Sequence, residues 1–210
     1  MNQRDKVDVS IYARGLSVLV RNPVIFIFPL VAIVVKILLD FLSGPIFDPL
    51  GGRDFGIIGL LGNLIDGFAF ALAIIAAETA WRNRRPTLSE TWDEGRRKAG
   101  GILMATLGFF FMIYVAGMLG GYLGPLGLIL SAAAFYFLIY TIPAAAIGGI
   151  PGGAALQASI DRVKSNYLAA AVLAVVSIVL YYYLVLILGV YLTEPLGLYA
   201  GYGIKVLGAI

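Results

Sequence analysis

Long apolar runs divide this chain, and its cationic residues alternate between the gaps that separate them. Of the fifteen Lys and Arg residues, twelve fall in every second gap, one falls in an intervening gap, one lies inside a run and one lies in the C-terminal tail. Apolar runs of about 20 residues match the length that a helix needs to cross a bilayer. Cationic segments beside spanning helices stay on the cytoplasmic side. The pattern predicts a multi-pass cell-membrane protein with a cytoplasmic N-terminus.

Composition points to the same class, an all-α integral membrane protein with one membrane domain over residues 1–210. Hydrophobic residues make up 60% of the 210 residues and charged residues 13%. A water-soluble domain of this size cannot hide so much apolar surface. The chain has no Cys and no His, which excludes disulfides, thiolate chemistry and imidazole ligands. We expect no metal and no cofactor, and the charged N-terminus predicts no removable signal peptide.

Five apolar runs are long enough for full spans, and a sixth is short. The full spans are expected at about 23–42, 56–80, 101–119, 126–149 and 167–192, and the short sixth segment at 196–210. The short segment could span, re-enter or lie on the surface. A returning sixth helix would place the C-terminus in the cytoplasm.

Each strongly cationic segment also contains a short amphipathic helix just before an outward-going span. These interfacial helices are expected at about 7–21, 88–98 and 153–165. In the second of them, Thr87 and Glu90 form a capping-box pattern. The recurrence is compatible with three copies of one unit, an interfacial helix followed by an outward and a return span. It is equally compatible with the general tendency of membrane proteins to keep basic helices inside.

Four polar side chains interrupt the first two spans: Lys36, Asp40, Asn63 and Asp66. A charge at mid-bilayer costs about 2.5–3.5 kcal/mol on insertion scales, so each one needs a partner or a function. The rise per residue puts Lys36 and Asp66 within about 5 Å of the same depth. Lys36 can therefore pair with Asp66, or with Asp40 one turn away. Such a pair either locks the first hairpin in register or forms a polar station on an ion or proton path.

Tyrosines form a second candidate cluster, between the fourth and fifth spans. Its members are Tyr136, Tyr140, Tyr181, Tyr182 and Tyr183. Three consecutive tyrosines cover most of a helix circumference, so at least one hydroxyl is expected to face a neighbour or water. The cluster is either a polar seam or a set of ordinary interhelical hydrogen bonds.

Helix breakers and paired glycines complete the membrane pattern. Pro29 and Pro143 lie inside expected spans, and Gly120 is one of several glycines with a second glycine four residues on. This spacing lets membrane helices approach closely. The alternative use is a hinge or a broken helix beside a cavity.

Six cations cluster between the second and third spans: Arg82, Arg84, Arg85, Arg96, Arg97 and Lys98. Basic side chains at the inner surface attract anionic lipid headgroups, each contributing about 1 kcal/mol. The cluster needs no nucleic-acid partner, and Glu78 is expected to pair with it. The bilayer and its anionic headgroups are therefore the first partners predicted for this chain.

Three local patterns resemble the small polytopic membrane proteins related to the membrane domain of glycerophosphodiester phosphodiesterases. They are Arg21-Asn22-Pro23 followed by an apolar run with Pro29, the turn Arg85-Pro86-Thr87-Leu88, and the segment Ala155–Asn166 ahead of a span. The resemblance implies a six-helix membrane module with interfacial helices. It carries over no activity, because no catalytic residue of that family maps onto this sequence.

These features favour a small channel or transporter for ions or small solutes, assembled as a homo-oligomer because so short a chain encloses a path most simply with copies of itself. The alternative is a non-catalytic lipid-interacting or scaffold module, which the basic interfacial helices favour. Membrane-embedded catalysis is the least favoured class, because the chain has no His, no Cys and none of the paired aspartates that would hold a magnesium pyrophosphate.

Overall fold

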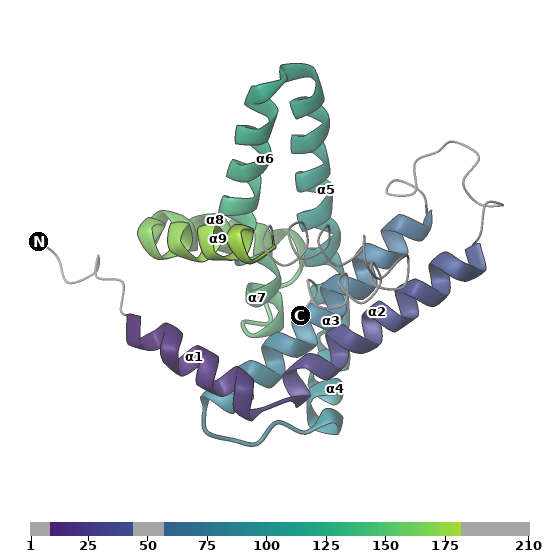
Figure 1. Ribbon diagram of the computed structural model, residues 1–210, viewed down its shortest axis with the longest axis vertical. Coiled ribbons are helices and arrows are strands. Elements are labelled where there is room, and N and C mark those ends of the chain that lie inside the picture. The colour runs from purple at the N-terminus through teal and green to yellow at the C-terminus, as the bar shows by residue number, and fades with distance from the viewer. Residues whose placement is uncertain (1–8, 44–56, 182–210) are drawn as a thin grey trace, which may run out of the picture.

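A computed structural model describes residues 9–43 and 57–181, and every regular element in these ranges is a helix (Figure 1). In chain order the helices are α1 (Val9–Arg21), α2 (Val24–Ser43), α3 (Ile57–Trp81), α4 (Leu88–Arg97), α5 (Ala99–Leu123), α6 (Pro125–Leu138), α7 (Thr141–Ala146), α8 (Gly152–Ser165) and α9 (Tyr167–Tyr181). The predicted helical class is confirmed. The expected short segment 196–210 and the second half of the expected fifth span lie outside the described residues.

Three helical segments are long and apolar enough to cross a membrane: Gly59–Trp81, Ala99–Gly120 and Ile129–Ala146. The number rises to five if each of two bent helix pairs, α1 with α2 and α8 with α9, counts as one span. The chain is therefore a helical membrane protein with three to five candidate spans in its described part. The second, third and fourth expected spans are each long and apolar enough by themselves. The first and fifth expected spans are counted only if each bent helix pair is taken as one span.

The core lies where α3, α5, α7 and α8 meet. Its buried residues are Ala71, Ile75, Ile102, Ala105, Ile142, Ala145, Ala146 and Ala155. Five of these eight are alanines, and small side chains let helix backbones approach closely in a membrane protein. The α2–α3 hairpin and the α5–α6 hairpin diverge from this core (Figure 1).

A sharp bend separates α1 from α2. The two helices differ in direction by 68° across Asn22 and Pro23. Proline disfavours helical geometry in the residue before it, which ends α1. The Asn22 side-chain amide donates to the Val18 carbonyl at 2.8 Å and so satisfies an otherwise open carbonyl in the last turn of α1. The bend turns an amphipathic helix into an apolar one, as the sequence predicts.

Local signals fix the turn between α3 and α4. Asn83 adopts a positive φ of 60°, and the Arg84 N–H donates to the Thr79 carbonyl at 3.1 Å, which together form a Schellman-type helix end. The Thr87 hydroxyl then accepts from the Glu90 N–H at 3.3 Å and donates to the Glu90 carboxylate at 2.9 Å. The predicted cap of α4 at Thr87 is confirmed.

Glycines close the turn between α5 and α6. A Cβ added to Gly120 would lie 2.8 Å from the Cα of Gly127, so the two backbones touch here. Gly124 has a positive φ of 59°, which side chains rarely tolerate. Gly120 therefore serves close packing, the first of the two uses expected for it.

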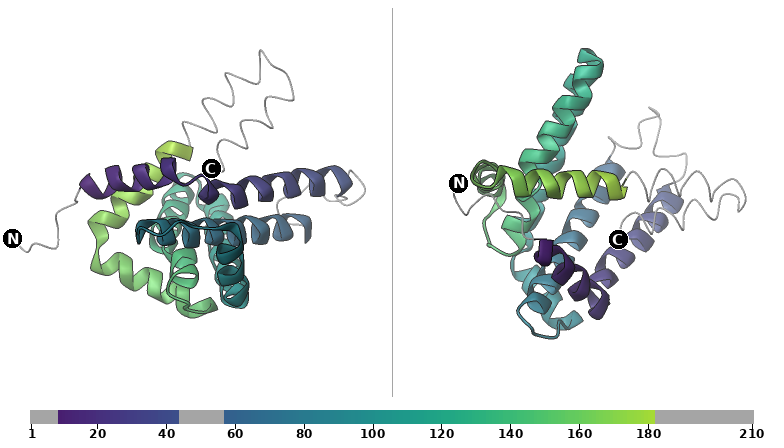
Figure 2. Two further views of the ribbon diagram at one scale, coloured as in Figure 1. Left: turned by 90° about the horizontal axis from the view of Figure 1, so that it is seen from below. Right: turned by 60° about the vertical axis from the view of Figure 1, so that its left-hand side comes forward.

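Helix α8 crosses α5, packs against it and forms an elbow of 110° with α9 (Figure 2). A Cβ on Gly101 would lie 3.5 Å from the Cα of Pro151, and one on Gly108 would lie 2.9 Å from the Leu156 side chain. Gly108 is nine residues into α5, which corresponds to about 14 Å along the helix. The expected interfacial helix 153–165 is thus present as a helix, but one face of it is built into the bundle, because glycines on α5 leave room for it.

Candidate functional site

The candidate site is an ion pair between the two helices of the first hairpin. Helices α2 and α3 pack side by side, and the Lys36 ammonium donates to a carboxylate oxygen of Asp66. The sequence left two acids open as partners of Lys36, and the structure forms the pair with Asp66. The Asp40 side chain lies outside the described part. The pair joins two predominantly apolar helices and ties them in register.

A glycine lets Lys36 reach across the hairpin. Gly62 is buried one turn before Asp66, and a Cβ built on it would lie 3.6 Å from the Lys36 Cε. The lysine stem therefore runs over the bare α3 backbone before its ammonium meets the carboxylate. Asn63 follows Gly62 and is half-buried. The polar side chains of α3 at this site, Asn63 and Asp66, therefore lie within about one helical turn.

The pair is only half-buried. The exposed fractions are 39% for the Lys36 side chain and 37% for the Asp66 side chain. Hydrocarbon offers neither hydrogen bonds nor solvation to charged groups. A half-exposed ammonium and carboxylate inside a span therefore have remaining capacity to bind water, an ion or another polar protein surface.

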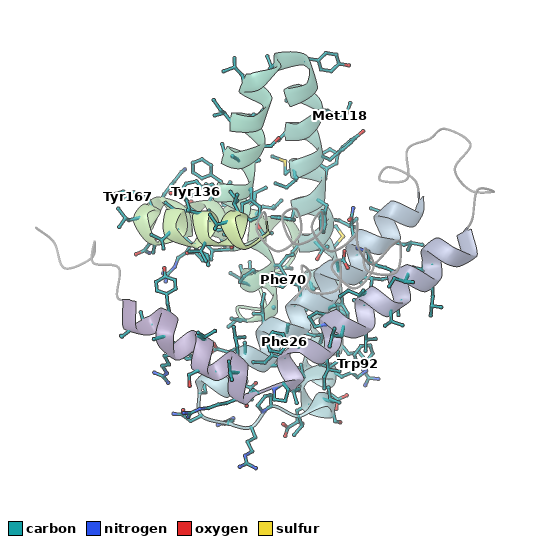
Figure 3. The ribbon with its side chains drawn as sticks, viewed as in Figure 1. Phe26, Phe70, Trp92, Met118, Tyr136 and Tyr167 are labelled. Carbon is teal, nitrogen blue, oxygen red and sulfur yellow. The ribbon has the colours of Figure 1, made fainter. Side chains whose placement is uncertain are left out.

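The tyrosine cluster is only partly formed in the described residues. The Tyr136 hydroxyl of α6 donates to the Tyr167 carbonyl at the start of α9, at 2.8 Å (Figure 3). This is an interhelical hydrogen bond of the ordinary kind. The Tyr140 side chain is half-buried. Tyr182 and Tyr183 lie outside the described residues, and so does the Tyr181 side chain, so the wider seam stays a prediction.

Ser159 is a buried polar residue that the sequence analysis did not single out. Helix α6 ends at Leu138 and α7 begins at Thr141. The fully buried Ser159 hydroxyl on α8 accepts from the Tyr140 N–H at 3.0 Å and donates to the Phe137 carbonyl at 2.8 Å. One side chain thus bridges the break. Pro143 lacks an N–H, so the sequence signals a break here. The residue that bridges the break, Ser159, lies 19 positions from Tyr140 and could not be identified from the local sequence.

The cationic cluster divides into exposed and engaged members. Arg84, Arg85 and Arg96 are exposed. Arg82 pairs with Glu78 at 2.7 Å, which confirms the pairing expected for Glu78. Arg97 pairs with Glu94 across one turn of α4 and stays largely exposed. Headgroup binding by these arginines stays a prediction, and their exposure is compatible with it.

Lys98 differs from its neighbours because it points into the protein. Its ammonium lies 2.8 Å from the Glu94 carboxylate and donates to the Ala146 carbonyl at 2.8 Å and the Ile147 carbonyl at 3.4 Å. Lys98 thus neutralises the carbonyl end of α7. The hydrogen bond from Lys98 holds the Glu94 pKa below its usual value, against the opposing effect of burial, and Arg97 lowers it further.

Two aromatic contacts attach the amphipathic helices to α3. The Arg14 guanidinium of α1 lies 4.3 Å from the centre of the Trp81 ring and donates to the Trp81 carbonyl at 3.1 Å. The Trp92 ring of α4 meets the Phe68 ring edge to face, with centres 6.0 Å apart. Cation–π contacts of this kind stabilise by about 0.5–1 kcal/mol when exposed. A cation–π contact therefore fixes α1 to α3, and an aromatic contact fixes α4 to α3.

Within residues 9–43 and 57–181, no group of three or more Asp and Glu side chains is arranged to hold a metal ion. No family model matches the chain, and no curated protein or solved structure is significantly similar to it. The sequence and the helices therefore carry the assignment: this is an integral membrane protein built of helices.

Proposed function

We propose that the protein forms a path for ions or small solutes across the cell membrane, with Lys36 and Asp66 as its polar station. The observation that carries this proposal is the half-exposed pair inside two apolar helices. A pair that served only to lock the hairpin is expected to have its remaining hydrogen-bonding groups satisfied by protein, because hydrocarbon cannot satisfy them. Its partial exposure leaves both charges able to contact a passing species.

The mechanism follows from the two charges. The carboxylate of Asp66 attracts a cation or a proton, and the ammonium of Lys36 offsets most of its charge, so binding at the station stays weak. Weak binding suits permeation, because a species must leave the site as readily as it enters. An approaching cation competes with Lys36 for Asp66, and Lys36 returns to Asp66 when the cation leaves.

Flux measurements test this proposal. Purified protein is reconstituted in vesicles, and the fluxes of protons, Na⁺, K⁺ and Cl⁻ are measured for wild type, Asp66→Asn and Lys36→Met. Loss of one charge from the path is expected to change at least one flux about tenfold or more, equivalent to about 1.4 kcal/mol. Glu78→Gln is the control, because Glu78 lies at the end of α3 and pairs with Arg82. Equal fluxes in wild type and both station variants would remove the pair from any path.

Lipid binding is the second candidate function, and a hollow on α4 favours it. Its volume is about 370 Å³, and it is lined by Glu90, Asp93, Arg96 and Arg97. Arginines suit a lipid phosphate, and the neighbouring acids suit an ammonium headgroup. The test compares retention of phosphatidylglycerol and phosphatidylethanolamine on the purified protein by native mass spectrometry. Arg96→Gln is expected to release lipid, whereas Lys164→Gln on α8 is the control; equal retention by both variants rejects α4 as the site.

The proposal also covers the orientation of the chain in the membrane, its family relationship and its non-catalytic role. The cytoplasmic side holds α1 and the segment 82–98, as the distribution of cations favours. The order of an amphipathic helix followed by an apolar one at α1–α2, α4–α5 and α8–α9 supports kinship with the membrane domain of glycerophosphodiester phosphodiesterases. We assign the chain a non-catalytic role, with residue 210 on the cytoplasmic side, which a reporter fused there can check.

A further inference from the structure

We infer that the α2–α3 face carrying Lys36 and Asp66 binds the same face of a second copy of this chain. The two copies are related by a two-fold axis along the membrane normal. Lys36 of each copy then meets Asp66 of the other, and the two half-exposed pairs become one cluster of four charges between the copies.

The packing of the hairpin leaves this face open. In the described ranges, α2 packs substantially against α3 only, and both members of the ion pair are more than a third exposed. Phe70, one turn from Asp66 on the same face of α3, is 51% exposed, and Val34, Leu38 and Leu61 on other faces of the hairpin are 57%, 53% and 44% exposed. Acyl chains can cover these apolar groups but cannot hydrogen-bond the charges. The pair is thus the part of this surface that needs a polar partner, which another protein surface can supply.

The geometry suits a second copy because the surface is self-complementary. Lys36 and Asp66 touch, so they lie at one depth in the bilayer. A two-fold axis along the membrane normal preserves depth, and it brings each ammonium opposite the other copy's carboxylate. An ammonium has three donors, so Lys36 can bind both carboxylates at once. Among the side chains that the structure describes on this face, each copy supplies one charge of each sign, so a second copy balances the first without a different partner protein.

This interface deepens the proposed function, because it rests on the same pair and places the path between copies. Its test measures association and not flux, so each proposal can fail without the other. A dimer without flux rejects the path alone, and flux through a monomer rejects the interface alone.

A charge exchange between copies tests the interface. Two differently tagged chains are produced together in one membrane, and co-purification is measured. Wild-type chains are expected to co-purify. Lys36→Asp places four acids in the interface and Asp66→Lys places four lysines there, so each variant is expected to lose self-association by about tenfold or more, as like charges in an interface do. A Lys36→Asp chain produced with an Asp66→Lys chain sets two acids against two lysines and is expected to recover association.

Cysteine cross-linking tests the interface even if the single charge variants fail to insert into the membrane. The chain has no Cys, so Phe70→Cys, one turn from Asp66 on α3, is expected to form a disulfide between copies on oxidation. The control is Met118→Cys near the far end of α5, and Figure 3 shows how far it lies from Phe70. The double variant Lys36→Asp/Asp66→Lys, which restores the pair with reversed polarity, is expected to cross-link at position 70 like the wild-type sequence. A monomeric wild-type protein, single variants that self-associate as well as wild type, or cross-linking at position 118 without cross-linking at position 70 overturns the inference.

Discussion

Lys98 donates a hydrogen bond to the carbonyl of Ala146, 2.8 Å away across 48 positions of sequence. The bond joins the junction of α4 and α5 to the end of α7. A charged donor at a helix C-terminus satisfies an open carbonyl and interacts favourably with the helix dipole. The amphipathic helix α4 is thereby tied into the bundle by a charge as well as by its apolar face.

Loss of Lys98 should destabilise the bundle more than loss of its neighbour. Lys98→Met removes the donor to Ala146 and leaves Glu94 with less compensation. Hydrogen bonds to charged groups contribute about 1.5–3 kcal/mol, so we expect a clearly lower unfolding temperature in a fixed detergent. Arg97→Met is the matched control, because the exposed Arg97 pair is expected to contribute about 0–1 kcal/mol. Equal unfolding temperatures for the two variants would contradict the role of Lys98.

Ser159→Ala should weaken the joint between α6 and α7. The substitution leaves the Tyr140 N–H and the Phe137 carbonyl without their bridging hydroxyl, and an unsatisfied buried polar group costs about 1–3 kcal/mol. Hydrogen exchange at the break should accelerate, and the unfolding temperature should fall. Ser165→Ala, whose exposed hydroxyl bonds only within its own helix end, should change neither. Unaltered exchange at Tyr140 in Ser159→Ala would contradict the bridge.

Gly120→Ala should force α5 and α6 apart. The added Cβ would lie 2.8 Å from Gly127 Cα and 3.2 Å from its carbonyl carbon, and backbone cannot yield as a flexible side chain can. Overpacking of this kind costs about 1–3 kcal/mol. Gly117→Ala on the same helix is the control, since nothing lies within 4 Å of its added Cβ. Thermal unfolding of the two variants should separate them, with Gly117→Ala equal to or above wild type.

The stabilising effect of Glu94 should disappear in acid. Its pKa is lower in the folded protein than its usual value of 4.5, because Lys98 donates a hydrogen bond to the carboxylate. A group with a lowered folded pKa stabilises fully above its unfolded pKa, and that stabilisation is lost as the pH falls through the folded pKa. The difference in unfolding temperature between wild type and Glu94→Gln should be full at pH 7 and shrink below pH 4.5. A difference independent of pH would assign the effect to packing.

Local composition was enough to predict most of the helices, although it predicted one span at 126–149 where the structure has α6 and α7. Each boundary signal acts within a few residues: Pro23 ends α1 and Thr87 begins α4. The depth of Lys36 and Asp66 could also be estimated, because rise per residue is constant in a helix. The sequence allowed Lys36 two acids, one turn away or on the next helix, and only the packing of α2 on α3 shows that Lys36 meets Asp66.

The sequence by itself determined that lipid is the solvent of this chain, because apolar length and the alternation of cations are read one segment at a time. Tertiary structure decided which polar groups serve the protein and which remain free to act on something else. Lys98 and Arg97 are neighbours of the same charge, yet one caps α7 and the other faces outward. Ser159 is one serine among several until α8 packs against the break at Tyr140. Such roles depend on contacts between residues far apart in the chain, and no local pattern encodes them.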